Sequence, residues 1–166
     1  MTFAIGRHMP AALAALALMT ALGGPVWAQA AAHSHDASHE TTLTLDNGRK
    51  WATDEPLRAG MTRIRGLVLP QLDAAHAGKL STAQYKALAS KVEVEVGGIV
   101  ANCKLEPKAD AMLHIVIADM AQGVDAMAGK NARMRPALGL VKVAQAVDQY
   151  GGHFDHPGFE PIRHVR

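Results

Sequence analysis

The chain is poor in the residues on which many functional sites are built. A single cysteine among 166 residues excludes an internal disulfide framework and every site that needs four thiolates. Aromatic residues make up only 4%, and the formal net charge is only +2. So small a net charge argues against a nucleic-acid binder that works by neutralising phosphates. The length suits one ordinary domain rather than two.

The sequence also lacks the usual marks of an enzyme. It contains no paired carboxylates, no Ser/His/Asp set and no metal-ligand helix motif of the i, i+4 kind. No glycine-rich turn follows a strand, so nucleotide binding is not expected either. We therefore predict a protein that is not an enzyme.

Residues 1–30 have the organisation of a secretory signal. Arg7 precedes an apolar run over 11–22, and Ala-Gln-Ala at 28–30 offers a cleavage site. This run is shorter than the roughly 20 apolar residues that a membrane span requires. We predict that 1–30 is cleaved and that the mature protein, without a membrane span, works in the oxidising periplasm. A retained N-terminal anchor is the alternative.

Four later segments repeat apolar residues at the spacing of amphipathic helices. The predicted helices run from Thr53 to about Gly78, from Ser81 to about Cys103, from about Pro107 to Gly129, and from about Pro136 to Gly152. Short connections favour antiparallel neighbours, so we predict an all-α fold, an up-down-up-down four-helix bundle over 51–166. A disordered, flexible, His-rich tail over 31–50 precedes it and contains a turn at 46–48.

Local signals mark several helix ends. Thr53 is the predicted N-cap of the first helix, and Pro70 is expected to kink that helix without ending it. Ser81 and Gln84 have the spacing of a capping box at the start of the second helix.

Antiparallel topology predicts where the side chains that carry chemistry meet. One end of the bundle receives sulfur, imidazole and aromatic groups, namely Trp51, Met61, Cys103, His114, Tyr150, His153 and His156. A thioether, a thiol and an imidazole together suit copper, particularly Cu(I). We therefore predict a copper site made by Met61, Cys103 and His114, with Asp110 orienting the His114 ring.

Each of these three residues has a simpler interpretation. Met61 lies about 12 Å along its predicted helix and His114 about 10 Å along its own, whereas Cys103 lies at a helix end. Met61 fits ordinary core packing, and His114 fits a hydrogen-bonded surface position. Cys103 fits a small buried hydrophobe whose pKa is raised by the negative end of the helix dipole.

The predicted tail offers a second copper site. Cleavage after Ala30 would expose the sequence Ala-Ala-His that ends at His33. Its amino group, two amides and imidazole supply four nitrogens in the square plane that Cu(II) and Ni(II) favour. His35 and His39 add further donors nearby. The alternative is a solvated spacer that happens to be rich in histidine.

Three separated segments carry a family resemblance. They read LDNGRKWATDEPLRAGMTRIR (45–65), IVANCKLEPKADAMLHIVIADM (99–120) and YGGHFDHPGF (150–159). In this order they resemble a small family of exported proteobacterial proteins, some of which carry the name DnrO. The resemblance spans about 45–160 and includes in its motifs Trp51, Met61, Cys103, Lys104 and His114. It implies an exported protein and assigns no metal ligand.

We predict from these patterns a periplasmic metal-binding protein that captures, buffers or delivers copper. Its expected partners are a metal ion and another periplasmic protein. One alternative is a four-helix cytochrome that binds haem b through Met61 and His153; the absence of a CxxCH motif excludes covalent haem attachment. The other alternative is a non-catalytic module that binds a protein.

Overall fold

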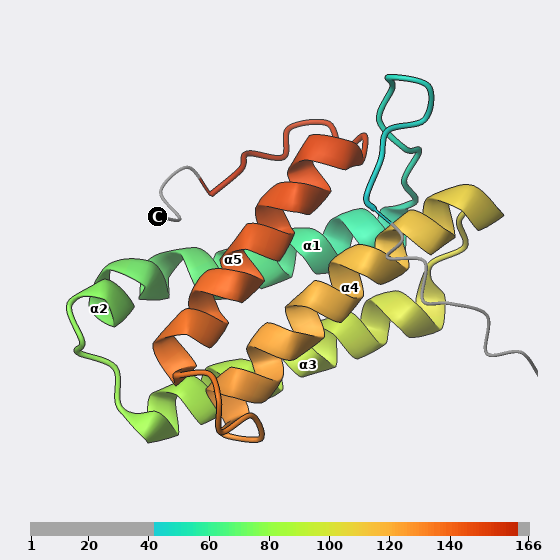
Figure 1. The fold of residues 1–166 in the computed structure, drawn as a ribbon. Coiled ribbons are helices and arrows are strands. Elements are labelled where there is room, and N and C mark those ends of the chain that lie inside the picture. The colour runs from blue at the N-terminus through green and yellow to red at the C-terminus, as the bar shows by residue number, and fades with distance from the viewer. Residues whose placement is uncertain (1–41, 163–166) are drawn as a thin grey trace, which may run out of the picture. The chain divides into compact units, whose positions relative to one another are not determined.

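The computed structural model of the protein describes residues 42–162, and this part of the chain is helical. Its elements are α1 (Glu55–Val68), the 3-10 turn η1 (Leu69–Gln71), α2 (Leu72–His76), α3 (Thr82–Asn102), α4 (Pro107–Ala128) and α5 (Pro136–His153) (Figure 1). Within the described residues there are two isolated β-bridges and no strand. The predicted all-α class is confirmed.

The first helix begins one residue later than predicted. Asp54, not Thr53, is its N-cap, and the Asp54 carboxylate accepts a hydrogen bond of 3.0 Å from the Leu57 N–H. The Thr53 hydroxyl instead donates to the Asp155 main-chain oxygen at 2.5 Å. A carboxylate at the N-cap also suits the positive end of the helix dipole.

Pro70 interrupts the first predicted helix instead of kinking it. The α-helical hydrogen bonding ends at Val68, Pro70 lies in the 3-10 turn, and the short helix α2 follows. Proline has no N–H to donate, and its ring collides with the carbonyl one turn earlier. The prediction that Pro70 kinks one helix without ending it was therefore wrong for the α-helical hydrogen bonding, whereas the predicted end near His76 and Gly78 agrees with the end of α2 at His76.

The other helix ends follow their sequence signals closely. The Ser81–Gln84 capping box is confirmed, since Ser81 Oγ accepts from the Gln84 N–H at 3.3 Å and Gln84 Oε1 accepts from the Ser81 N–H at 2.8 Å. Gly129 ends α4 in the left-handed conformation, with a φ of 79°. The last helix, α5, continues one residue beyond Gly152, to His153.

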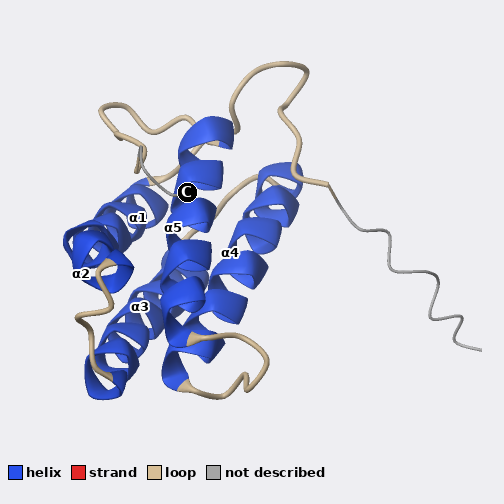
Figure 2. Cartoon of the chain, turned by 60° about the vertical axis from the view of Figure 1, so that its left-hand side comes forward, coloured by secondary structure: helices blue, strands red, loops and turns tan. Residues whose placement is uncertain are grey.

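The core lies between the four long helices α1, α3, α4 and α5 (Figures 1 and 2). Its largest fully buried side chains include Leu57, Met61, Ile64, Ile99, Leu113, Met120, Met127, Leu140, Tyr150 and Phe154. The most extensive helix pairing joins α4 to α5. There Gly123 and Gly139 face each other so closely that an added Cβ on either would lie 2.6 Å from the main-chain oxygen of the other.

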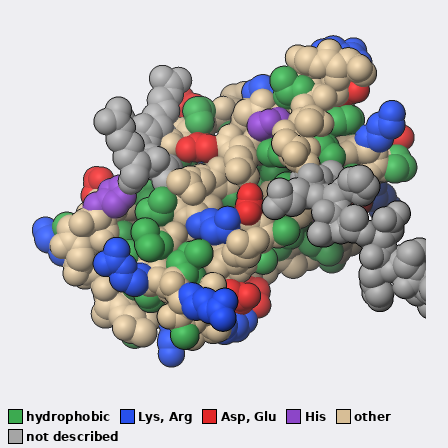
Figure 3. All heavy atoms as spheres, viewed as in Figure 1, with side chains coloured by type: hydrophobic (Ala, Val, Ile, Leu, Met, Phe, Trp, Pro, Cys, Tyr) green, Lys and Arg blue, Asp and Glu red, His purple; other side chains and the backbone are tan. Residues whose placement is uncertain are grey.

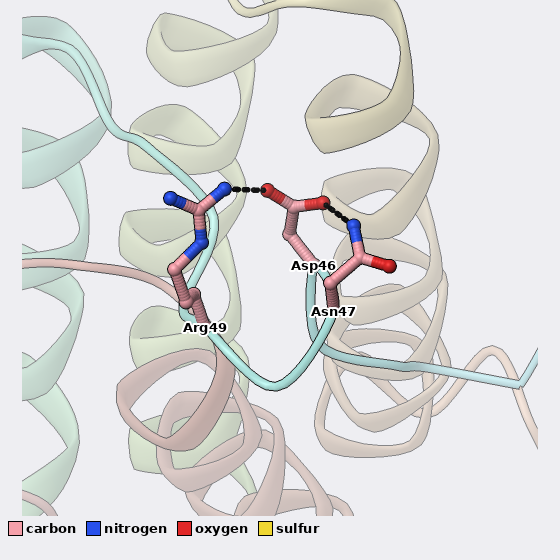
Figure 4. Close-up of polar contacts among 3 residues, drawn as sticks. All are labelled: Asp46, Asn47 and Arg49. Carbon is pink, nitrogen blue, oxygen red and sulfur yellow. Dashed lines mark hydrogen bonds and ion pairs between the residues drawn. The ribbon is translucent and has the colours of Figure 1, made fainter.

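The segment before α1 is held against the helices. A tight turn joins Asp46 to Arg49 through two main-chain hydrogen bonds of 2.8 and 2.9 Å, and their side chains form an ion pair (Figure 4). Asn47 and Gly48 both have positive φ, as the predicted turn at 46–48 requires. The Trp51 indole N–H donates to the Thr44 main-chain oxygen at 2.6 Å, which fixes this loop locally.

The segment after α5 is held in a similar way. Arg65 of α1 donates to the Glu160 main-chain oxygen at 2.5 Å, and the Ile162 N–H donates to the Asp148 carboxylate. The Ile162 side chain is buried. Residues 154–162 thus connect α1 with α5 although they contain no helix.

Among the described residues, one helix, α4, is long enough and apolar enough to cross a membrane, judged by length and composition alone. Core helices of water-soluble proteins meet the same criteria, and α4 buries a full side against its neighbours. Charged side chains of both signs are interspersed over the face seen in Figure 3.

Candidate functional site

The segments flanking the helices meet at one end of α5. The Trp51 N–H donates to the His153 main-chain oxygen and the Asp155 N–H donates to the Trp51 oxygen, both at 2.8 Å. The Lys50 ammonium adds a 2.6 Å hydrogen bond to the Gly151 oxygen. Main-chain pairing therefore joins Trp51 to His153, two residues that the sequence analysis expected at the same end of the bundle.

Tyr150 is the most deeply buried polar side chain at this end. It is fully buried, stacks on Phe154 with ring centroids 5.2 Å apart, and meets Phe159 edge-on. Its hydroxyl lies 2.9 Å from His156 Nδ1. Burial raises the pKa of Tyr150 far above its ordinary value, so the phenol stays protonated. This enclosed hydroxyl has one hydrogen to donate, and His156 Nδ1 is its hydrogen-bond partner among the described residues, so we assign the phenol as donor and Nδ1 as acceptor.

His156 is consequently fixed in one tautomer. Burial, followed by the positive charge of Arg58, lowers the pKa of His156 below its ordinary value. The ring is therefore neutral at physiological pH, with Nδ1 accepting from Tyr150 and the hydrogen on Nε2. The sequence analysis placed both residues at this end of the bundle but missed their pairing. The one available signal was the density of aromatic residues at 150–159 in a chain otherwise poor in them.

Cys103 follows the last residue of α3 and is half-buried. Burial is the main cause that raises the pKa of its thiol, and the charges of Asp54 and Asp110 raise it further. The sequence analysis also expected a raised pKa for Cys103, but it named the helix dipole as the cause. The main causes in the structure are desolvation and the two carboxylates. An isolated thiol in this setting is protonated and weakly nucleophilic.

Asp54 connects the start of α1 to the loop that follows Cys103. One carboxylate oxygen caps α1, and the other accepts from the Lys104 N–H at 2.6 Å. The residue next to Cys103 is thereby tied to α1. The sequence analysis did not single out this carboxylate as a part of the site.

His114 lies on α4, one turn after Asp110, and its side chain is exposed. Its Nδ1 lies 2.9 Å from the Asp110 main-chain oxygen and 3.4 Å from the Asp110 carboxylate. A carbonyl oxygen only accepts, so Nδ1 carries the hydrogen and Nε2 is left with its lone pair. The predicted orienting contact with Asp110 is present, and it comes mainly from the main chain.

Met61 lies elsewhere. Its side chain is 1% exposed and belongs to the central hydrophobic core. Since His114 is exposed and Met61 is fully enclosed, the described structure does not gather the three predicted ligands around one opening. The placement of Met61 matches its simpler interpretation as core packing.

The haem alternative needs Met61 and His153 to face a shared cavity. The His153 ring is half-buried at the end of α5, where its Nδ1 lies 2.8 Å from the Gln149 main-chain oxygen. Met61 is in the core. The haem hypothesis stays a prediction.

No group of three or more His, Cys, Asp or Glu side chains is arranged to hold a metal ion within residues 42–162. His33, His35 and His39, the predicted ligands of the tail, lie outside the described residues.

Neither protein-family models, nor curated proteins, nor solved structures give a match to this chain.

Proposed function

We propose that this chain is an exported, non-catalytic protein that binds copper, with Cys103 at the α3–α4 junction and His114 on α4 as its principal ligands. In this proposal residues 1–30 are a cleaved signal peptide, the protein works in the periplasm as part of the DnrO-like family, and the helices form an antiparallel up-down-up-down bundle behind a flexible His-rich tail.

The electrostatic setting of Cys103 is the observation that carries the proposal. Two carboxylates, Asp54 and Asp110, act on a thiol that is still partly accessible. Negative charge opposes formation of a free thiolate, but the same charge attracts a cation. A bound metal ion displaces the thiol proton to solvent and leaves a metal–thiolate bond. This setting therefore suits metal binding better than nucleophilic catalysis.

The fixed tautomer of His114 supports the same conclusion. A metal-ligating histidine usually donates its second ring N–H to a carbonyl or carboxylate, which orients the ring. The contact between His114 Nδ1 and the Asp110 oxygen has this form, and it leaves Nε2 for a metal. A thiolate and an imidazole are ligands that copper prefers over magnesium or calcium.

The proposal does not require Met61 as a ligand, because its side chain is enclosed in the core. A Met61 variant is used to test this. The tail histidines His33, His35 and His39 are proposed to collect copper ions before delivery to Cys103. Cleavage after Ala30 is a condition for the four-nitrogen Cu(II) site at His33, and mass spectrometry of the exported protein checks it.

The experiment is a competition titration of the mature protein with Cu(I) and a chromophoric Cu(I) chelator under reducing conditions. We expect one tight site, lost in Cys103→Ser and weakened in His114→Ala. Met61→Leu, which conserves volume in the core, should leave the affinity unchanged if Met61 is not a ligand. His76→Ala, a change at an exposed histidine on α2, is the matched control. Unchanged affinity in Cys103→Ser would remove the proposed site.

A further inference from the structure

A surface pocket of about 440 Å³ lies beside the Tyr150–His156 pair and plays no part in the proposed copper site. It is lined by Ala52, Thr53, Arg58, Asp155, His156 and Pro157. These residues come from the segment before α1, from α1 itself and from the segment after α5. We call it the Arg58 pocket.

Arg58 is held in place within this pocket. One guanidinium nitrogen, Nη1, donates to the Thr53 main-chain oxygen at 2.7 Å and to the Thr53 hydroxyl oxygen at 3.0 Å. Thr53 is in turn tied to the Asp155 main chain. Both contacts of Arg58 use the same nitrogen, so its other N–H groups remain to bind a planar carboxylate.

His156 supplies a second donor on the pocket wall. Its Nδ1 is directed to the buried hydroxyl of Tyr150. The two ring nitrogens point in divergent directions, so the Nε2–H is directed away from Tyr150 and is left for another partner. The same ring lines the pocket.

Asp155 brings the opposite charge to the same pocket, and its side chain is exposed. None of the ion pairs among residues 42–162 joins Arg58 to Asp155. A fixed cation and an anion thus line one hollow without neutralising each other. Charge complementarity favours a ligand that also carries both signs, because a simple anion would be repelled by Asp155.

A second hollow, of about 550 Å³, shares Ala52 and Asp155 with the Arg58 pocket. Its remaining lining residues are Asp46, Arg49 and Lys50. All three are polar, so a ligand that extends from the Arg58 pocket meets polar rather than apolar surface there.

We propose that the Arg58 pocket binds a small zwitterion of the amino acid or dipeptide class. The ligand carboxylate contacts the Arg58 guanidinium and the His156 Nε2–H, and its ammonium group contacts the Asp155 carboxylate. This inference does not depend on copper binding, and metal-free protein is used to test it.

The test is isothermal titration calorimetry of the full metal-free chain with four probes: L-asparagine, diglycine, acetate and ethylammonium. We expect one zwitterion to bind with a Kd of about 1 mM or lower, at least about tenfold more tightly than acetate or ethylammonium. The better of L-asparagine and diglycine identifies the class. No binding by either zwitterion overturns the proposal.

Two variants locate the site. Asp155→Asn should weaken zwitterion binding about tenfold, since a hydrogen bond between charged groups is lost, and should leave acetate binding intact or improved. Arg58→Gln should abolish the binding of both the zwitterion and acetate. Asp73→Asn, at an exposed carboxylate on α2, is the matched control. Because Asp155 is exposed, its variant stays informative if Arg58→Gln does not fold; unchanged zwitterion affinity in Asp155→Asn contradicts the assignment.

Discussion

At the scale of single residues, the pairing of Tyr150 with His156 resolves a problem that burial creates. A phenol hydroxyl enclosed among Phe154 and Phe159 has lost water as a partner, and an unpaired buried hydroxyl is costly. His156 Nδ1 accepts its hydrogen at 2.9 Å. Two measurable consequences follow for stability.

The first consequence is a dependence on pH. Since the pKa of His156 is lowered in the folded protein from the ordinary 6.5, the unfolded chain binds the proton more readily. The free energy of unfolding should therefore fall as the pH falls through the ordinary value, and level off below the folded pKa. Urea denaturation between about pH 8 and pH 5 measures it. His156→Gln should show a flatter profile than the parent protein, and an equally steep one would contradict the assignment.

The second consequence concerns the hydroxyl itself. Tyr150→Phe removes the donor and leaves His156 Nδ1 without it, so the free energy of unfolding should fall by about 1 kcal/mol. The control is Tyr85→Phe at the other tyrosine, whose hydroxyl has no hydrogen-bond partner among the described residues and whose pKa is raised by burial alone. We expect a change near zero there by urea denaturation. Equal effects in both variants would show that the His156 contact contributes nothing.

At the scale of elements, α4 and α5 owe their close approach to two glycines. A Cβ on Gly123 would meet the Gly139 oxygen at 2.6 Å and the Val143 side chain at 2.7 Å. A Cβ on Gly139 would meet Ala126 Cβ at 2.8 Å. The obstacles include main-chain atoms, which cannot rotate away, so any side chain here forces the helices apart.

Gly123→Ala should therefore lower the free energy of unfolding by about 1–3 kcal/mol despite the better helix propensity of alanine. Gly97→Ala on α3 is the matched control, because its added Cβ meets nothing within 4 Å. That substitution should stabilise the protein by about 0.5–1 kcal/mol. Chemical denaturation of both variants measures the difference, and the same sign in both would refute the close contact.

Asp54 acts on two elements at once, since it caps α1 and binds the Lys104 N–H after α3. Asp54→Ala should lower the free energy of unfolding by about 2 kcal/mol, which is in the upper part of the range for an N-cap. The effect is large because a second main-chain donor, the Lys104 N–H, also loses its partner. Ser81→Ala removes the cap of α3 and should cost about 1 kcal/mol. Thermal and urea unfolding compare the two, and a smaller loss at Asp54 would argue against the bridging role.

The elements themselves were largely predictable from the sequence. Apolar spacing located the long helices, and the Ser81–Gln84 pair and Gly129 marked ends that the structure confirms. Thr53 and Asp54 are both good N-caps, and only the tertiary contact of Thr53 with Asp155 decides between them. The effect of Pro70 depends on whether neighbouring packing holds the helix together, which local sequence does not contain.

The candidate site was less predictable, because side-chain direction matters more there than the helix on which a residue lies. The sequence analysis expected Trp51 and His153 at one end of the bundle without predicting their contact, and main-chain hydrogen bonds join them in the structure. One position along a helix turns a side chain by about 100°, so Leu113 is buried while its neighbour His114 is exposed. The contact of Asp54 with the Lys104 N–H joins segments 50 residues apart and leaves no local signal. Tyr150 and His156 are only six residues apart, but the cluster of aromatic residues at 150–159 does not show which of them pair.

At the scale of the whole molecule, the two proposed sites draw on different charge patterns. Carboxylates surround a thiol at the α3–α4 junction, while a guanidinium and a carboxylate share the Arg58 pocket. The two proposals can therefore fail separately: Cys103→Ser should leave zwitterion binding intact, and Asp155→Asn should leave copper binding intact.

The copper proposal as a whole depends on a metal–thiolate bond at Cys103. X-ray absorption spectroscopy at the copper edge, on the mature protein loaded with one equivalent of Cu(I), observes that bond directly. The account predicts a sulfur neighbour and a nitrogen neighbour in the parent protein and in Met61→Leu, with the sulfur lost in Cys103→Ser. A spectrum with only nitrogen and oxygen neighbours, or one in which Cys103→Ser retains the sulfur, would contradict it.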